Sequence, residues 1–195
     1  ENILPMSYND AQKLADHLKI EKNKNEVRVL DLASGSGVWG IGLAQKSPRV
    51  RVTAVDWAGM IPTTQRITDK FGVRGQFEFI AGDLHDVDFG RGYDIATLGH
   101  ILHSEGEERS RKLLKKTFGA LKSGGTIAIA EWLVNEDRTG PPPALMFAVN
   151  MLVNTEQGDT FSFGELKSWL REAGFKNARK FQAHHPSPLV LATKR

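Results

Sequence analysis

Cysteine is absent from the 195-residue sequence, which excludes disulfide bonds, cysteine nucleophiles and zinc sites with cysteine ligands. Apolar stretches that approach the roughly 20 residues of a membrane-spanning helix are also missing. The 26 Lys and Arg residues are interspersed with 23 Asp and Glu residues, so no block of one charge indicates nucleic acid binding. We therefore expect a cytoplasmic protein whose partners are neither membranes nor nucleic acids.

The alternation of short apolar segments with amphipathic segments predicts an α/β fold. The tail from Phe175 onward, with Pro186 and Pro188 in its turn, predicts a closing antiparallel hairpin. Ser104 and Glu107 predict a capping box that opens a helix reaching about Leu121. We expect a Rossmann-like, doubly wound, mostly parallel seven-stranded sheet, with strands over 27–32, 51–55, 77–80, 93–98 and 126–130 and helices over 8–20, 60–71, 104–121, 143–154 and 163–173, besides a helix that follows the glycine-rich turn within 35–46.

Polar or flexible residues stand at the carboxyl ends of five consecutive predicted strands. They are Asp31, Asp56, Asp83, the group Gly99, His100 and His103, and Glu131. In open α/β sheets, ligands bind in a crevice at the carboxyl ends of the strands. The pattern therefore predicts one ligand crevice at this edge of the sheet.

A glycine-rich loop indicates a nucleoside-containing ligand. Residues 35–40 read G-S-G-V-W-G between a predicted strand and helix, and Asp56 follows about 20 residues after the first glycine. This spacing fits a dinucleotide such as NAD, and it also fits S-adenosylmethionine. Asp31 is expected to face the ligand, where a carboxylate is unfavourable beside a pyrophosphate and favourable beside a sulfonium and an ammonium group. The residues therefore favour S-adenosylmethionine.

Four segments in order resemble the motifs of class I S-adenosylmethionine-dependent methyltransferases. They are V-L-D-L-A-S-G-S-G at 29–37, A-V-D-W at 54–57, A-G-D-L at 81–84 and L-K-S-G-G-T at 121–126. The resemblance implies that S-adenosylmethionine is the cofactor and S-adenosylhomocysteine the product. It implies cofactor contacts from Asp31, Ala33, Gly35, Ser36, Gly37, Asp56, Trp57, Asp83, Leu84 and Gly99.

The later half resembles the small-molecule O-methyltransferases of the plant caffeate and bacterial polyketide or carotenoid type. The resemblance lies in I-L-H at 101–103, I-A-E at 129–131, N-M-L-V at 150–153 and F-G-E-L at 163–166. It implies that His103 is the general base for the acceptor hydroxyl, that Glu131 orients its imidazole, and that Asp159 is the nearest candidate for a second acid. A phenol needs deprotonation and the sulfonium is already an activated methyl donor, so no metal is expected.

The acceptor pocket is expected to be apolar. We expect it to be lined by Met6, His100, Trp132, Met146, Phe147, Asn150 and Met151. His100 and His103 could share a metal, but no cluster of carboxylates supports this, so His100 is assigned to the pocket wall. His184 and His185 are expected to be solvated. The sequence departs from the plant members at Gly99, where they carry lysine, and at Ser104-Glu105, where they carry Asp or His and an aromatic residue.

The first residue is Glu1 and not methionine, and we interpret the sequence as part of a longer chain. The resemblance implies that residues 1–25 link to an N-terminal dimerising domain of winged-helix type, that residues 26–195 form the catalytic domain, and that the whole protein is a homodimer. Methyl transfer to nitrogen or carbon, with a structural His103, stays open as an alternative. A non-catalytic cofactor-binding module also stays open, whereas a nicotinamide dehydrogenase is opposed by Asp31.

Overall fold

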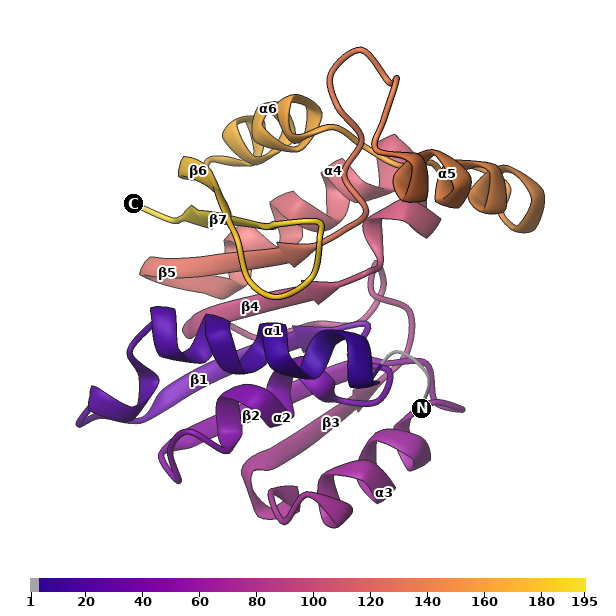
Figure 1. Ribbon diagram of the computed structural model, residues 1–195. Coiled ribbons are helices and arrows are strands. Elements are labelled where there is room, and N and C mark those ends of the chain that lie inside the picture. The colour runs from indigo at the N-terminus through magenta and orange to yellow at the C-terminus, as the bar shows by residue number, and fades with distance from the viewer. Residues whose placement is uncertain (1–3) are drawn as a thin grey trace.

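The computed structural model describes residues 4–195, with side chains from residue 7 onward. Its strands are β1 (Val27–Leu32), β2 (Val50–Asp56), β3 (Phe77–Ala81), β4 (Tyr93–Gly99), β5 (Leu121–Ala130), β6 (Lys176–Phe181) and β7 (Leu189–Thr193). They form one seven-stranded sheet in the order β3-β2-β1-β4-β5-β7-β6 (Figure 1). Strands β1 to β5 run parallel, and β7 is antiparallel to both β5 and β6. The predicted α/β fold and the C-terminal hairpin are confirmed.

Helices cover both faces of the sheet. They are α1 (Leu4–His17), α2 (Val38–Ala44), α3 (Ile61–Lys70), α4 (Leu102–Ala120), α5 (Pro142–Asn154) and α6 (Phe163–Ala173), with short 3₁₀ turns at Ile20–Lys22 and Arg74–Gln76. Apolar residues of α4 and α6 pack into one core cluster, and those of α1, α2 and α3 pack into another. Because β1 is covered on both sides, Leu30 and Leu32 join the first cluster and Val27 and Val29 the second.

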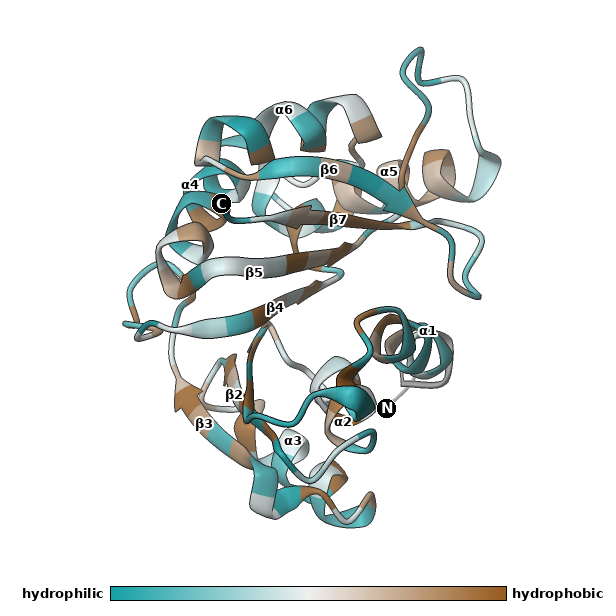
Figure 2. Cartoon of the chain, turned by 90° about the vertical axis from the view of Figure 1, so that its left-hand side faces the viewer, coloured by the Kyte–Doolittle hydropathy of each residue, from teal (hydrophilic) through white to brown (hydrophobic). Residues whose placement is uncertain are grey.

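The hairpin and the first helix complete the two layers. Figure 2 shows hydrophobic β7 between β5 and the hydrophilic edge strand β6. Charged side chains on such an edge oppose pairing with other chains. On the other face, Ala11 and Leu14 of α1 are fully buried, so this helix belongs to the same core as the sheet, although its sequence was interpreted as part of a linker. None of the helices in the described part of the chain is both long and apolar enough to cross a membrane.

Helix α4 starts differently from the prediction. It begins at Leu102, and the expected capping box of Ser104 and Glu107 is wrong, because the Ser104 hydroxyl donates to the Ile101 carbonyl at 2.9 Å. The first turn is capped by Glu131 at the end of β5, which accepts from the Leu102 N–H at 2.7 Å. This cap comes from a residue that is distant in sequence.

Candidate active site

The glycine loop joins β1 to α2 and is held on both sides by polar contacts. Gly35 and Gly37 have φ of 51° and 76°, and a Cβ on Gly37 would lie 3.0 Å from the Thr64 side chain. The Gly35 N–H donates to Asp56 at 2.7 Å, and the Thr64 hydroxyl donates to the Gly35 carbonyl at 2.6 Å. Ser36 is half-buried on the same loop. Glycine permits this left-handed backbone, and at position 37 it also avoids a contact with α3.

Asp31 lies beneath the glycine loop and not on its surface. Its side chain is fully buried and accepts from the Thr97 hydroxyl at 2.6 Å and from the Gly40 N–H at 3.0 Å. Burial raises the pKa of Asp31 to about 7, against the opposing effect of these two hydrogen bonds. The side chain is thus buried below the loop surface, and its expected contact with the ligand stays a prediction. Its carboxyl group ties the start of α2 to β4.

The ends of β2 and β3 present the residues expected around the nucleoside. Asp56 is 8% exposed and also accepts from the Trp57 N–H at 2.7 Å. Each of its two oxygens accepts one of these hydrogen bonds and retains a further lone pair. Trp57 is 61% exposed at the end of β2, so its indole is not part of the core. Asp83 accepts from the His85 N–H at 2.8 Å, and Leu84 is buried next to it.

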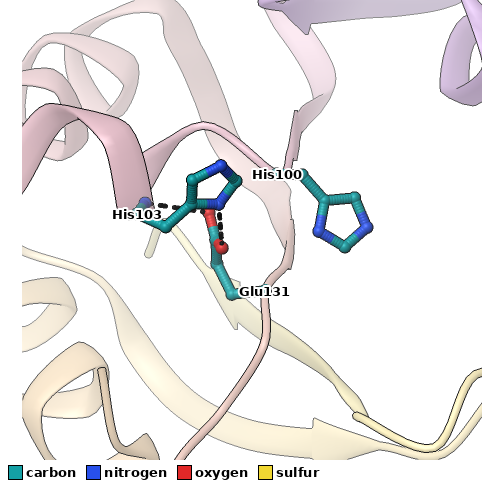
Figure 3. Close-up of side chains that lie close together, drawn as sticks. All are labelled: His100, His103 and Glu131. Atoms are coloured by element: carbon teal, nitrogen blue, oxygen red, sulfur yellow. Dashed lines mark hydrogen bonds and ion pairs between the residues drawn. The ribbon is translucent and has the colours of Figure 1, made fainter. Parts of the chain in front are cut away.

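His103 and Glu131 form a hydrogen-bonded pair at the ends of neighbouring elements (Figure 3). Nδ1 of His103 lies 2.7 Å from a Glu131 oxygen, and the two side chains are 12% and 2% exposed. Burial alone would raise the pKa of Glu131, but His103 and neighbouring donors outweigh it and lower that pKa. A charged carboxylate on Nδ1 favours the tautomer with the proton there, and in a neutral imidazole this tautomer has its free lone pair on Nε2.

His100 lies beside this pair in a left-handed backbone conformation, with φ of 62°. Burial lowers its pKa, which favours neutral imidazole, and within the described residues its buried Nδ1 has no hydrogen-bond partner. One ligand atom from each of His100, His103 and Glu131 lies within 4.8 Å of the others, a grouping that can hold a metal ion. Both Glu131 oxygens and Nδ1 of His103 already bond to protein groups.

Residues 9–176 match the model of the O-methyltransferase domain family. The chain belongs to this O-methyltransferase family. It is 33% identical over 159 residues to 3-hydroxy-5-methyl-1-naphthoate 3-O-methyltransferase of Streptomyces sahachiroi, which covers 82% of this chain and 46% of that protein. The chain spans about half the length of the curated relatives that it matches.

Two solved structures extend the comparison. A Nostoc punctiforme PCC 73102 protein assigned to the O-methyltransferases is 31% identical, with a TM-score of 0.86 over 97% of this chain and 57% of that one. PigF with bound S-adenosylhomocysteine is 25% identical, with a TM-score of 0.76 over 100% of this chain and 61% of that one. The α/β fold of the O-methyltransferase domain is thus shared by proteins of more than one origin.

The departure at Gly99 has a steric explanation. A Cβ on Gly99 would lie 2.1 Å from Nε1 of Trp39, a buried residue of α2. A side chain such as the lysine of plant O-methyltransferases does not fit beside this indole. Trp39 was not singled out from the sequence, where it stands as one of the variable positions of the glycine motif.

Aromatic side chains surround the His103–Glu131 pair. The Phe147 ring meets His103 edge-on at 4.8 Å, and Trp132 lies 5.8 Å from Phe147 and 4.5 Å from His185. His184 is exposed, as expected, but the expectation of a solvated His185 is wrong. The His185 ring packs against Trp132, and its backbone N–H donates to the buried Asp10 of α1 at 3.0 Å, which holds the hairpin turn over the site. The position of Asp10 on the apolar face of the first helix is the feature of the sequence that indicates such a buried contact.

The other predicted acceptor and acid residues divide between the pocket and the surface. Met151 is buried, whereas Met146 and Asn150 are exposed on α5. The side chain of Met6 lies outside the described residues. Asp159 donates its N–H to the His103 carbonyl at 2.9 Å, but its carboxylate accepts from Arg138 at 3.0 Å and not from the imidazole.

Proposed function

We propose that this domain transfers a methyl group from S-adenosylmethionine to a hydroxyl group of a small aromatic or polyketide-like acceptor. The observation that carries the proposal is the buried His103–Glu131 pair at the carboxyl edge of an O-methyltransferase domain. A hydroxyl needs a base before it becomes a good nucleophile. The arrangement supplies one nitrogen with a free lone pair and a carboxylate behind it.

The strand ends fit the cofactor. Asp56 would accept from the ribose hydroxyls, and Asp83 with Leu84 would hold the adenine ring. Gly35 and Gly37 allow the left-handed backbone of the loop, whose main-chain groups would face the methionine part. When bound, S-adenosylmethionine supplies a methyl group that is activated by its positively charged sulfur. The protein therefore has to bind, orient and deprotonate, and needs no metal for these tasks.

His103 would take the proton of the acceptor hydroxyl on Nε2. Glu131 keeps the other ring proton on Nδ1 and stabilises the imidazolium that forms, because its lowered pKa keeps it charged. Its second oxygen accepts from the Leu102 N–H at 2.7 Å, so the carboxylate cannot turn away from the ring without losing this bond. The pair acts as one unit.

The acceptor would lie against Phe147, Trp132 and His185. Their rings stand within stacking and edge-on distances of one another. Flat aromatic acceptors gain both burial and ring contacts on such a wall. His100 adds a neutral imidazole, whose lowered pKa keeps charge away from the methyl donor. The shape and polarity of this wall support an aromatic or polyketide-like acceptor.

The test replaces His103 with alanine in the full-length protein and measures transfer of labelled methyl groups to a panel of phenols. We expect turnover to fall by roughly 10²–10⁴-fold, the usual contribution of a general base. The affinity for S-adenosylhomocysteine, measured by calorimetry, should stay nearly unchanged. His184→Ala is the matched control because its side chain is exposed. Transfer that survives His103→Ala would contradict the assignment of the base and would favour another acceptor atom.

A further inference from the structure

The helical turn that carries His103 is separated from the rest of α4. Gly106 has φ of 72° and ψ of 175°, which interrupts the helix after residue 105. A Cβ on Gly106 would lie 2.6 Å from the Gln157 carbonyl oxygen, so this position requires glycine. We call residues 102–105 the base turn. Because the helix is interrupted, the position of the base turn depends on contacts with other segments.

Glu105, the last residue of the base turn, reaches the loop that follows β3. One oxygen of its carboxylate lies 2.8 Å from Nε2 of His85 and also accepts from Nε of Arg109 at 2.6 Å. The second guanidinium nitrogen of Arg109 lies 3.6 Å from the Asp83 carboxylate. Four side chains thus form a polar chain, from His85 through Glu105 and Arg109 to Asp83, between the base turn and residues 83–85.

The loop itself is fixed mainly from α4. The Asp83 carboxylate accepts from the His85 N–H at 2.8 Å, and the Lys116 ammonium donates to the carbonyls of Leu84 at 2.7 Å and His85 at 3.0 Å. These contacts hold the backbone of the segment expected to bind adenine. The His85 side chain then places its Nε2 on Glu105, so His85 joins the loop to the base turn.

The degree of burial separates this link from ordinary surface ion pairs. The side chains of His85 and Glu105 are 16% and 14% exposed. Glu108 and Lys112 on the same helix form an i,i+4 pair whose side chains are 76% and 64% exposed. Exposed pairs contribute little because water and salt screen them, whereas shielded hydrogen bonds to a charged group are stronger. The two pairs therefore offer a test and a matched control.

We propose that Glu105 is a positioning residue that couples residues 83–85, here called the adenine loop, to the base turn through His85. The proposal rests on the proposed function, which places adenine at residues 83–84 and the acceptor proton at His103. Loss of the link should loosen the loop and the base turn together. Cofactor affinity and turnover should then both fall, while the KM for the acceptor changes little. This gives Glu105, a departure from the plant sequences, a task in the site.

The experiment uses the full-length protein with Glu105→Gln, His85→Ala, the double variant, His85→Gln and Glu108→Gln. Calorimetry measures S-adenosylhomocysteine affinity, and methyl-transfer kinetics give kcat and both KM values. We expect Glu105→Gln and His85→Ala each to weaken that affinity by about tenfold, as for one charge-assisted hydrogen bond, with the double variant no worse than either. His85→Gln should retain most of the affinity, because its amide N–H can still donate to Glu105. Glu108→Gln should stay within about twofold of wild type.

Each arm can overturn the proposal. Additive losses in the double variant would show that Glu105 and His85 act separately. An equal loss of cofactor affinity in Glu108→Gln would point to a general effect of charge on α4. If His85→Ala keeps its affinity within twofold of wild type, the contact between His85 and Glu105 does not couple the two segments. Where Glu105→Gln fails to fold, the two His85 variants test the same contact. Calorimetry requires no turnover, so the link is judged independently of whether His103 is the base.

Discussion

Replacement of Glu131 by glutamine is a sharp test of the site, because the structure shows two donors on one carboxylate. Oε1 accepts from the Leu102 N–H at 2.7 Å, and Oε2 lies 2.7 Å from Nδ1 of His103. The side chain is 2% exposed, so water does not replace either bond freely. A carboxylate accepts on both oxygens, but an amide accepts on one atom and donates from the other. Glutamine can therefore satisfy only one of the two N–H groups.

The two orientations of the amide have different consequences. With its oxygen on Leu102, the amide N–H₂ donates to Nδ1 of His103 and moves the ring proton to Nε2. With its oxygen on His103, a buried Leu102 N–H is left unpaired, which destabilises the fold by about 1–3 kcal/mol. The first orientation is favoured, and it presents Nε2–H to the acceptor, a group that cannot take a proton. We expect kcat to fall by roughly 10²–10⁴-fold, the upper value being that of an amide behind a catalytic histidine in a serine protease triad.

The assay compares Glu131→Gln with Glu131→Ala, which imposes no tautomer. Methyl-transfer rates and nitrogen NMR of the labelled histidines report the activity and the position of the ring proton. We expect Glu131→Gln to be as slow as Glu131→Ala or slower, although glutamine has the shape of the native side chain. A rate for Glu131→Gln within tenfold of wild type, or a proton that stays on Nδ1 of His103, would refute the reasoning.

Two further predictions concern the frame of the site. The pKa of Asp31 is raised from 3.8 to about 7 in the folded protein, so the folded state binds this proton more tightly and stability falls as pH rises through that range. In urea unfolding, the free energy of unfolding of Asp31→Asn should rise relative to that of wild type between about pH 4.5 and about pH 7.5, by at most about 4 kcal/mol. A difference between the two proteins that stays constant with pH would contradict this. Gly99→Ala should destabilise the fold by about 1–3 kcal/mol, because the added methyl would lie 2.1 Å from Trp39. Thermal unfolding should recover in the Gly99→Ala/Trp39→Phe double variant, and recovery that fails would show that the indole is not the obstacle.

Local patterns in the sequence were sufficient to predict the fold. The apolar run of residues 27–32 and the glycines at 35 and 37 lie close together in the sequence. Together they predict a buried strand and the turn that follows it. The rule that strand ends meet at one edge then brings Asp56 and His103 to the same side of the sheet. Periodicity therefore determines which residues reach the site region.

Interactions between segments that are distant in sequence could not be predicted from local patterns. The cap of α4 is Glu131, which follows β5, whereas the local sequence pattern indicates a cap at Ser104. The packing of Trp39 on Gly99 and the hold of Asp10 on His185 join segments that are far apart in sequence. Each depends on side-chain packing after folding, and no spacing rule encodes it. The burial of Asp31 likewise follows from the tight fit of α2 over β1 and β4.

The base turn explains why interactions between distant segments are concentrated around the site. A helix interrupted at Gly106 cannot fix His103 by its own hydrogen bonds, so other segments have to do so. Glu131 holds the turn from β5, the N–H of Asp159 holds the His103 carbonyl from the loop after α5, and His85 holds Glu105 from the loop after β3. The loop after β3 and the loop after α5 thus both help to position the His103 imidazole. A base held in this way is placed correctly only when both flanking segments are in position, which links deprotonation of the acceptor to a fully assembled site.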